Sequence, residues 1–243
     1  MMGMAALQYP LAEKALRYLN AEPLLHMSMI FPIRRGTAEV LHAAAEGVFL
    51  HETQSDAYML SATDFETGKP WLDGVGRHPL VCVHQRCFAD YLNRKYGYAM
   101  QLDCFQAVYT KKNLLPIDAG SGLEIRALQP KAAQEVYQHY HDNADLDYIC
   151  GRIMAGELFG GFEGDKLCGF IGTHTEGSIG LLHILPDCRR RGFARKMESF
   201  MVNRALNAGR VPFSQISLDN EQSLALHRSL GFELSNKVLH WLF

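Results

Sequence analysis

The segment LPDCRRRGFARKMESF, residues 185–200, constrains the fold of this chain more than any other part of the sequence. The residues before it, SIGLLHILP, predict a strand that ends at Pro186, and the residues after it have the spacing of a long helix that stops at Gly209. The segment therefore predicts a strand, a short turn and a helix that begins near Arg190. A helix N-terminus has unpaired backbone N–H groups and a partial positive charge, so this junction suits an anion.

The turn also has the composition of a phosphate site. Gly192 has no side chain that would keep a ligand away, and Arg189–Arg191 offers forked, charged donors that match phosphate oxygens. Two kinds of ligand fit such a turn: nucleic acid and a phosphorylated small molecule. The formal net charge of -2, and the absence of neighbouring aromatic residues other than Phe193, argue against nucleic acid. The spacing Arg189-x-x-Gly192-x-Ala194 therefore predicts a cradle for the diphosphate of a small molecule.

The sequence contains no apolar run of the roughly 18 residues that a membrane span needs. The N-terminal segment MMGMAALQYPLAEKALRYL includes Glu13 and Lys14 and is typical of an amphipathic helix rather than of a signal peptide. The six cysteines are scattered without framework spacing, as is typical of free thiols in a reducing compartment. We therefore expect a cytoplasmic protein with neither a membrane nor a nucleic-acid partner.

The residues after Gly122 alternate regularly between strand and helix patterns, in the order β-α-α-β-β-β-α-β-α-β. The first half predicts a helix over residues 4–20, a helix that ends at Gly97, and strands. These strands cover residues 47–52, 58–62, 80–83 and 100–110. The lysines, proline and small polar residues of KKNLLPIDAGSG, 111–122, indicate a domain boundary. We expect an N-terminal α/β domain over 1–115 and a second domain over 122–243.

Two motifs in order resemble those of a known family. R-x-x-G-x-A at 189–194, after a strand of the type L-x-I-x-P, resembles the acetyl-CoA signature of the GNAT superfamily of N-acetyltransferases. DNEQSLALHRSLGF, 219–232, is similar to the N-x-x-[AS]-x-x-L-[YH]-x-x-x-G-F segment that closes that fold. The resemblance implies an α/β (α+β) protein whose C-terminal half is a mixed, mostly antiparallel sheet flanked by helices. The tandem layout is also similar to the glycine N-acyltransferase-like branch, which implies that residues 1–115 are a degenerate copy, although its motifs are absent there.

The resemblance implies acetyl-CoA as co-substrate and assigns residues to it. The main chain around Leu182, Ile184 and Leu185 would pair with the pantetheine arm like an added strand. The backbone N–H groups of Arg191–Ala194 would hold the diphosphate with help from Arg189 and Arg190, and Asn220 and Ser223 would lie near the thiol. The cofactor-binding set is thus Leu182, Ile184, Leu185, Arg189, Arg190, Arg191, Gly192, Phe193, Ala194, Asn220 and Ser223. Asn220 has an equally good alternative as a helix N-cap.

Acyl transfer to an amine needs a base for the ammonium and an acid for the leaving thiolate. The family's glutamate matches Ser178 here, which cannot act as a base, so Glu176 is our first candidate and His183 our second. His227 occupies the position at which the family commonly has a tyrosine that acts as the general acid. A histidine can also donate a proton near neutral pH. The alternatives are a solvated Glu176, a satisfied interior His183 and a helix-surface His227.

These residues lead to two hypotheses. The first is an N-acyltransferase that transfers acetyl to the primary amine of a small or amino-acid-like acceptor. The second, motivated by Ser178, is a non-catalytic acyl-CoA sensor or structural module. Tyr137, Tyr140, Tyr148 and Phe159 would border the acceptor site, with simple packing as an equal alternative. We expect no metal, because Cys82-x-His84-x-x-Cys87 lacks a second ligand pair. The terminal segment VLHWLF is apolar enough to pack against the N-terminal half or against a second subunit, which is compatible with a homodimer.

Overall fold

The computed structural model describes residues 2–117, 122–140 and 145–243. The chain forms two compact units, each with its own consecutive run of strands in the sheet order. The first unit comprises Met1–Val108, Gln215–Ala225 and Glu233–Phe243, and the second comprises Tyr109–Ser214 and Leu226–Phe232. Strand β10 (Phe213–Ser217) and helix α8 (Glu221–Leu230) contribute residues to both units.

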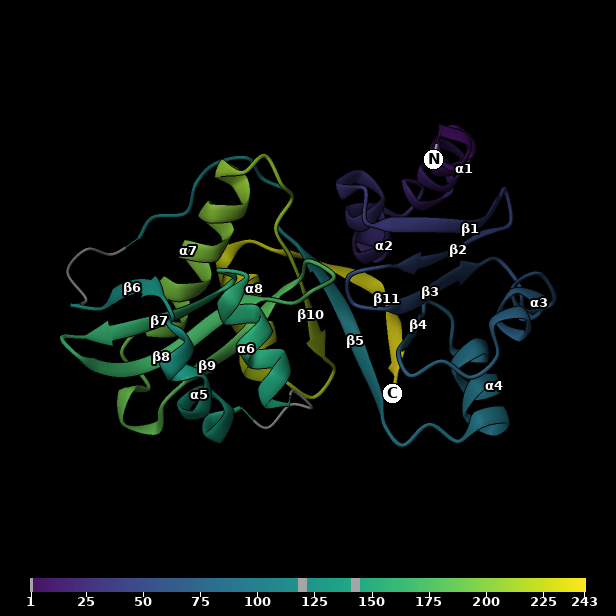
Figure 1. Ribbon diagram of the computed structural model, residues 1–243. Coiled ribbons are helices and arrows are strands. Elements are labelled where there is room, and N and C mark those ends of the chain that lie inside the picture. The colour runs from purple at the N-terminus through teal and green to yellow at the C-terminus, as the bar shows by residue number, and fades with distance from the viewer. Residues whose placement is uncertain (1, 118–121, 141–144) are drawn as a thin grey trace. The chain divides into compact units, whose positions relative to one another are not determined.

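The sheet of the first unit has the strand order β1-β2-β3-β4-β11-β5. Its strands are β1 (Ala38–Ala44), β2 (Gly47–Glu52), β3 (Ala57–Ala62), β4 (Val81–Val83), β5 (Gln101–Val108) and β11 (Glu233–Leu242). Neighbouring strands are antiparallel except for β3 and β4, which are parallel. The strand β11 lies between β4 and β5, so residues far apart in the sequence complete one sheet (Figure 1).

Helices cover both faces of this first sheet. In β2, Val48, Phe49 and Leu50 are all buried. Successive strand side chains point to opposite faces, so both faces must be covered. Phe49 packs in a cluster with residues of α3 (Phe65–Val75) and α4 (Arg86–Tyr96). The helix α1 (Met2–Leu19) lies against β1 and β2, and the helix α2 (Pro23–Arg35) lies against β1, β5 and β11 (Figure 1).

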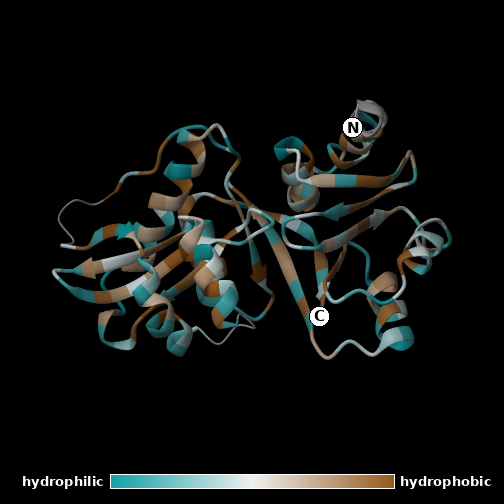
Figure 2. Ribbon diagram, in the orientation of Figure 1, coloured by the Kyte–Doolittle hydropathy of each residue, from teal (hydrophilic) through white to brown (hydrophobic). Residues whose placement is uncertain are grey.

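The second unit has the strand order β10-β9-β8-β7-β6. Its other strands are β6 (Glu124–Ala127), β7 (Leu158–Glu163), β8 (Lys166–Thr173) and β9 (Ile179–Ile184), which are antiparallel to one another. α5 (Ala133–His139) and α6 (Leu146–Met154) pack against Phe170 and Leu181, and α7 (Phe193–Asn207) packs against β8 and β9 from the other face. Hydrophobic segments run through these strands (Figure 2).

The predicted fold class and the predicted element order after Gly122 are confirmed. The predicted helix over 4–20 is α1, and the four predicted strands of the first half are β2, β3, β4 and β5. α2, β1 and α3 were not predicted. The proposed limits of the two domains stay a prediction, and part of the segment that suggested them, 118–121, lies outside the described residues. The same holds for 141–143, where the first of the two helices expected after Gly122 would end.

Helix α7 begins at Phe193 rather than near Arg190, so the prediction of its first residue was wrong. A short 3-10 helix, η3 (Pro186–Cys188), follows β9, and both Arg190 (φ 59°) and Gly192 (φ 78°) are left-handed. A residue with a left-handed backbone cannot belong to a right-handed α-helix, so helical geometry starts only after Gly192.

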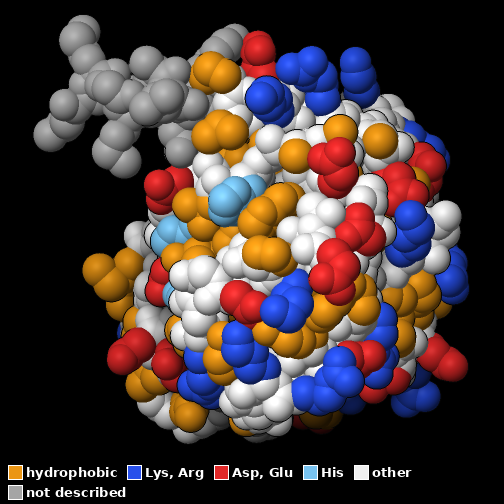
Figure 3. Space-filling model, turned by 90° about the vertical axis from the view of Figure 1, so that its right-hand side faces the viewer, with side chains coloured by type: hydrophobic (Ala, Val, Ile, Leu, Met, Phe, Trp, Pro, Cys, Tyr) orange, Lys and Arg blue, Asp and Glu red, His pale blue; other side chains and the backbone are white. Residues whose placement is uncertain are grey.

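Charges of both signs mix on the face shown in Figure 3, where Lys and Arg side chains are interspersed with Asp and Glu. This distribution agrees with the formal net charge of -2. Among the described residues, no helix is both long enough and apolar enough to cross a membrane.

Candidate functional site

The turn between β9 and α7 forms the centre of the candidate site. Gly192 is the N-cap of α7, and a Cβ built on it meets nothing within 4 Å. The first intrahelical bond runs from the Lys196 N–H to the Gly192 carbonyl at 3.1 Å. The N–H groups of Phe193, Ala194 and Arg195 precede it and have no acceptor within the helix. The turn therefore presents donors beside an open space, which is what an anion requires.

The three arginines of this turn have different surroundings. Arg189 Nε donates to the Ile184 carbonyl at 3.0 Å, which ties the turn to the end of β9. Arg191 makes a two-pronged bond to the carboxylate of Glu163, with Nη1 2.7 Å from Oε2, and its guanidinium lies 4.6 Å from the centre of the Phe193 ring. The bond from Arg191 lowers the pKa of Glu163. Arg190 is exposed. Two arginines thus hold the turn in shape, and the third faces solvent.

A β-bulge interrupts β9. Phe170 pairs with His183 and Gly172 with Gly180, so Leu181 and Leu182 together oppose the single residue Ile171. Leu181 is buried and has φ 56°, in the left-handed region that a leucine rarely adopts. An inserted residue bends a strand and ends regular pairing. Within the described register, β10 pairs with β9 only at Ser214 and Ile179.

Beyond the bulge, the backbone groups of β9 divide between its two sides. Leu185 N–H donates to the Cys168 carbonyl at 2.9 Å, and the Leu185 carbonyl accepts from Cys188 N–H at 2.8 Å, so both groups of Leu185 are engaged. Successive residues of a strand direct their backbone groups to opposite sides. The N–H group of Ile184 therefore points away from β8, toward the edge that an added strand would use, whereas Leu182 belongs to the bulge.

Glu176 lies in the tight turn between β8 and β9 and is 8% exposed. The turn is closed by a bond from His174 N–H to the Ser178 carbonyl at 2.8 Å. The Ser178 hydroxyl donates to Glu176 Oε1. Ser178, the residue at the family's glutamate position, thus holds the carboxylate two residues earlier.

Two residues of this region were missed as a pair by the sequence reasoning. The Tyr148 hydroxyl, on α6, lies 2.7 Å from His174 Nδ1. Burial, and then the charge of Glu176, raise the pKa of Tyr148 to about 12, so the phenol stays protonated at neutral pH. The sequence places Tyr148 only at the border of the expected acceptor site, and nothing in its spacing connects Tyr148 with His174.

The two other histidines lie in different environments. His183 is half-buried, with its ring stacked 5.5 Å from Phe170 and 6.1 Å from His139. His227, on α8, is 3% exposed. Its Nε2 lies 3.1 Å from Ser214 Oγ and 3.3 Å from a carboxylate oxygen of Glu198, which is itself buried.

Asn220 caps α8, because its side-chain oxygen accepts from Ser223 N–H at 3.0 Å. The capping alternative is therefore correct. Both residues belong to the first unit, whereas the turn at Gly192 belongs to the second. Their contact with the cofactor stays a prediction.

Comparisons with known proteins agree with this geometry. Residues 158–242 match the family model described as FR47-like protein. A Drosophila protein of known structure has a TM-score of 0.73 at 14% identity, with 98% of this chain and 95% of that chain covered. A GCN5-related N-acetyltransferase-like protein from Streptococcus suis has a TM-score of 0.55 at 13% identity, with 96% and 99% covered. A putative acetyltransferase of the GNAT family from Novosphingobium aromaticivorans has a TM-score of 0.55 at 13% identity, with 89% and 94% covered.

The search of curated proteins found no match. The structural likenesses establish the fold, and the matched family model covers β7 to β11, the stretch that contains the turn at Gly192. The chain therefore has the fold of the GNAT superfamily, and its residues 158–242 match the FR47-like family model.

Proposed function

We propose that this protein is an acyl-CoA-dependent N-acyltransferase that transfers acetyl from acetyl-CoA to a primary amine. The acceptor would be a small or amino-acid-like molecule that attacks directly in a ternary complex. The observation that carries the proposal is the turn at Gly192, which combines a left-handed N-cap, open space where a Cβ would lie and a row of helix N–H groups. These features suit the diphosphate of coenzyme A.

The rest of the cofactor would follow β9. A pantetheine arm carries amides that can pair with a strand edge. The N–H group of Ile184 faces that edge by the alternation of strand residues, Leu182 lies beside it in the bulge, and both backbone groups of Leu185 are engaged. We assign the pairing with the pantetheine arm to Leu182 and Ile184. Leu185 instead holds the end of β9 in place through its hydrogen bonds to Cys168 and Cys188.

Glu176 is our candidate for the base. The acceptor must lose a proton before its nitrogen attacks the thioester carbon, and the buried carboxylate of Glu176 can take that proton. The Ser178 hydroxyl, which donates to Glu176, keeps the carboxylate in one orientation. As the new N–C bond forms, the C–S bond breaks and the electron pair leaves with sulfur. His183 remains the second candidate for the base.

His227 is our candidate for the acid that protonates the departing thiolate. Its contacts with Ser214 and Glu198 hold the ring in one place. Its low exposure means that the role requires the thiol end of the cofactor to reach α8. Kinetic separation of turnover from cofactor affinity is the test of this role.

A second candidate function is a non-catalytic acyl-CoA sensor, which is favoured by Ser178 at the position of the family's glutamate. One experiment separates the two functions. Acetyl-CoA is titrated into the protein by calorimetry, and release of free thiol is then followed with a panel of primary amines. The enzyme predicts binding and amine-dependent thiol release, whereas the sensor predicts binding alone. The absence of binding heat would contradict both.

A further inference from the structure

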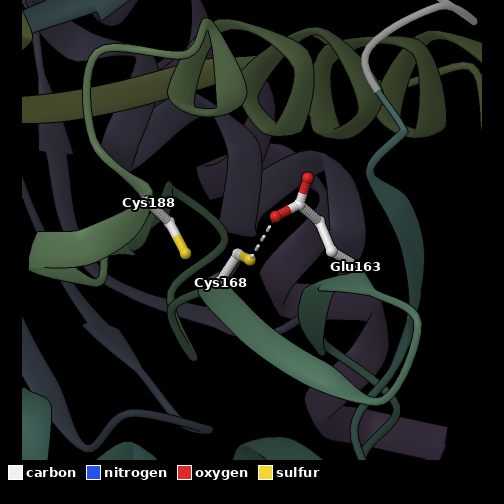
Figure 4. Close-up of side chains that lie close together, drawn as sticks. All are labelled: Glu163, Cys168 and Cys188. Carbon is white, nitrogen blue, oxygen red and sulfur yellow. Dashed lines mark hydrogen bonds between the residues drawn. The ribbon is translucent and has the colours of Figure 1, made fainter.

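Three side chains near the turn at Gly192 form a cluster that the proposed reaction does not use. Glu163 ends β7, Cys168 lies on β8 and Cys188 lies in η3, and Figure 4 shows all three directed into one small space. One ligand atom from each lies within 4.8 Å of the others. Both cysteines are fully buried, whereas the side chain of Glu163 is 29% exposed.

The spacing of these atoms matches the edge of a tetrahedral metal site. Zinc binds thiolate at about 2.3 Å and carboxylate at about 2.1 Å, so a tetrahedral angle places sulfur and oxygen about 3.6 Å apart. Cys168 Sγ lies 3.6 Å from Glu163 Oε2. This pair of atoms therefore already has the separation that a tetrahedral site requires, and the other pairs of ligand atoms lie within 4.8 Å.

The surroundings of Glu163 supply what a metal-bound carboxylate needs. Arg191 binds both of its oxygens, and a ligating carboxylate is usually held by such an outer partner. The positive guanidinium also balances charge, because two thiolates and one carboxylate exceed the charge of a divalent cation by one. The partial exposure of Glu163 gives an ion a path from solvent to the cluster.

We propose that Glu163, Cys168 and Cys188 bind a thiophilic divalent cation of the Zn²⁺ class. Two sulfur ligands select such an ion over Mg²⁺ or Ca²⁺, which prefer oxygen. On binding, each thiol gives its proton to solvent and both sulfurs bond to the metal. The ion would tie η3, and with it the segment that leads to Gly192, to β7 and β8. This inference does not depend on the proposed acyl transfer.

Co²⁺ is the probe for the test, because its thiolate complexes absorb light strongly. Reduced, metal-free protein is titrated with Co²⁺ and then with Zn²⁺. We expect a thiolate-to-cobalt absorption band that saturates at one ion per chain and disappears when Zn²⁺ displaces it. Cys168→Ser and Cys188→Ser should each abolish the band, and Glu163→Gln should weaken binding by about 10-fold or more.

Cys104→Ser is the matched control, because Cys104 is also a buried thiol but lies outside the cluster. This variant should bind Co²⁺ as the wild type does. If either cluster serine variant fails to fold by circular dichroism, Glu163→Gln still tests the site, because its side chain is partly exposed and glutamine has nearly the same size as glutamate.

Several results would overturn the proposal. The first is the absence of the thiolate-to-cobalt band in the reduced wild type. The second is a band of full strength in both Glu163→Gln and Cys188→Ser, and the third is loss of the band in Cys104→Ser. A Cys168–Cys188 disulfide formed on mild oxidation, together with no Co²⁺ binding by the reduced protein, would identify a redox pair instead. None of these measurements involves coenzyme A, so they leave the acyltransferase proposal untouched.

Discussion

Replacing Gly192 by alanine would put a methyl group into the space where the diphosphate is proposed to bind. Nothing lies within 4 Å of a Cβ at this position, so the methyl would meet no protein atom. Its effect on a ligand can therefore be separated from damage to packing. The substitution should still lower the free energy of unfolding, because alanine disfavours the left-handed backbone that Gly192 adopts, φ 78°.

The same helix offers a matched control. Gly209 follows α7, has φ 68°, and also has nothing within 4 Å of its Cβ. A left-handed alanine costs roughly 1 kcal/mol relative to glycine, so Gly192→Ala and Gly209→Ala should lower the free energy of unfolding by similar amounts. Only the first variant alters the proposed site.

The expected loss of affinity follows from the donors at the start of α7. A hydrogen bond to a charged group contributes about 1.5–3 kcal/mol. A methyl that keeps the diphosphate from one N–H group should thus raise the dissociation constant of coenzyme A by roughly 10- to 100-fold. Calorimetric titration of coenzyme A, with urea unfolding of the same samples, gives both quantities.

A wild-type dissociation constant for coenzyme A in Gly192→Ala, with as much loss of stability as in Gly209→Ala, would refute the proposed diphosphate site. Equal loss of affinity in both variants would also refute it, because the effect would then come from general destabilisation of α7 and not from the turn.

Three further predictions concern the reaction and the fold. Glu176→Gln should lower kcat by about 100-fold or more at unchanged acetyl-CoA affinity, because the amide cannot take a proton; a wild-type rate of thiol release would remove Glu176 as the base. His227→Ala should likewise lower kcat far more than acyl-CoA affinity; an equal effect on both would indicate a structural role. Burial, and then the charge of His26, lower the pKa of His84 to about 3. Between about pH 6.5 and pH 3, His84 is therefore protonated in the unfolded state but stays neutral in the folded state. The free energy of unfolding should fall by up to about 1.4 kcal/mol for each pH unit over this range. Urea unfolding at pH 7 and pH 5 should show this slope in the wild type and a smaller one in His84→Gln.

The second half of the fold was well predicted from the sequence because the residues that mark its turns and helix ends lie within short segments. Gly164 and Gly209 mark a hairpin and a helix end in single short segments, and both have the positive φ that turns require. The helix α2 was missed for a physical reason. Every residue from Leu25 to Pro32 is buried, so the helix has no polar face and no 3.6-residue period to detect.

The candidate site was only partly predictable for a related reason. The motif at Gly192 is contiguous, so its spacing is visible in the sequence. The pair of Tyr148 and His174, and the cluster of Glu163, Cys168 and Cys188, arise only when separate elements pack together. The bulge at Leu181 carries no sequence signal either, since a left-handed leucine is held there by its surroundings and not by its own preference.

The place of β11 between β4 and β5 affects how the protein can be made. A ribosome completes residues 109–214 before it reaches 233–242, so the first sheet waits for its middle strand throughout that interval. During this time β4 and β5 expose unpaired backbone edges, which attract other chains. A fragment that stops at residue 115 would keep those edges permanently, and we expect it to aggregate unless a peptide spanning 233–243 is supplied.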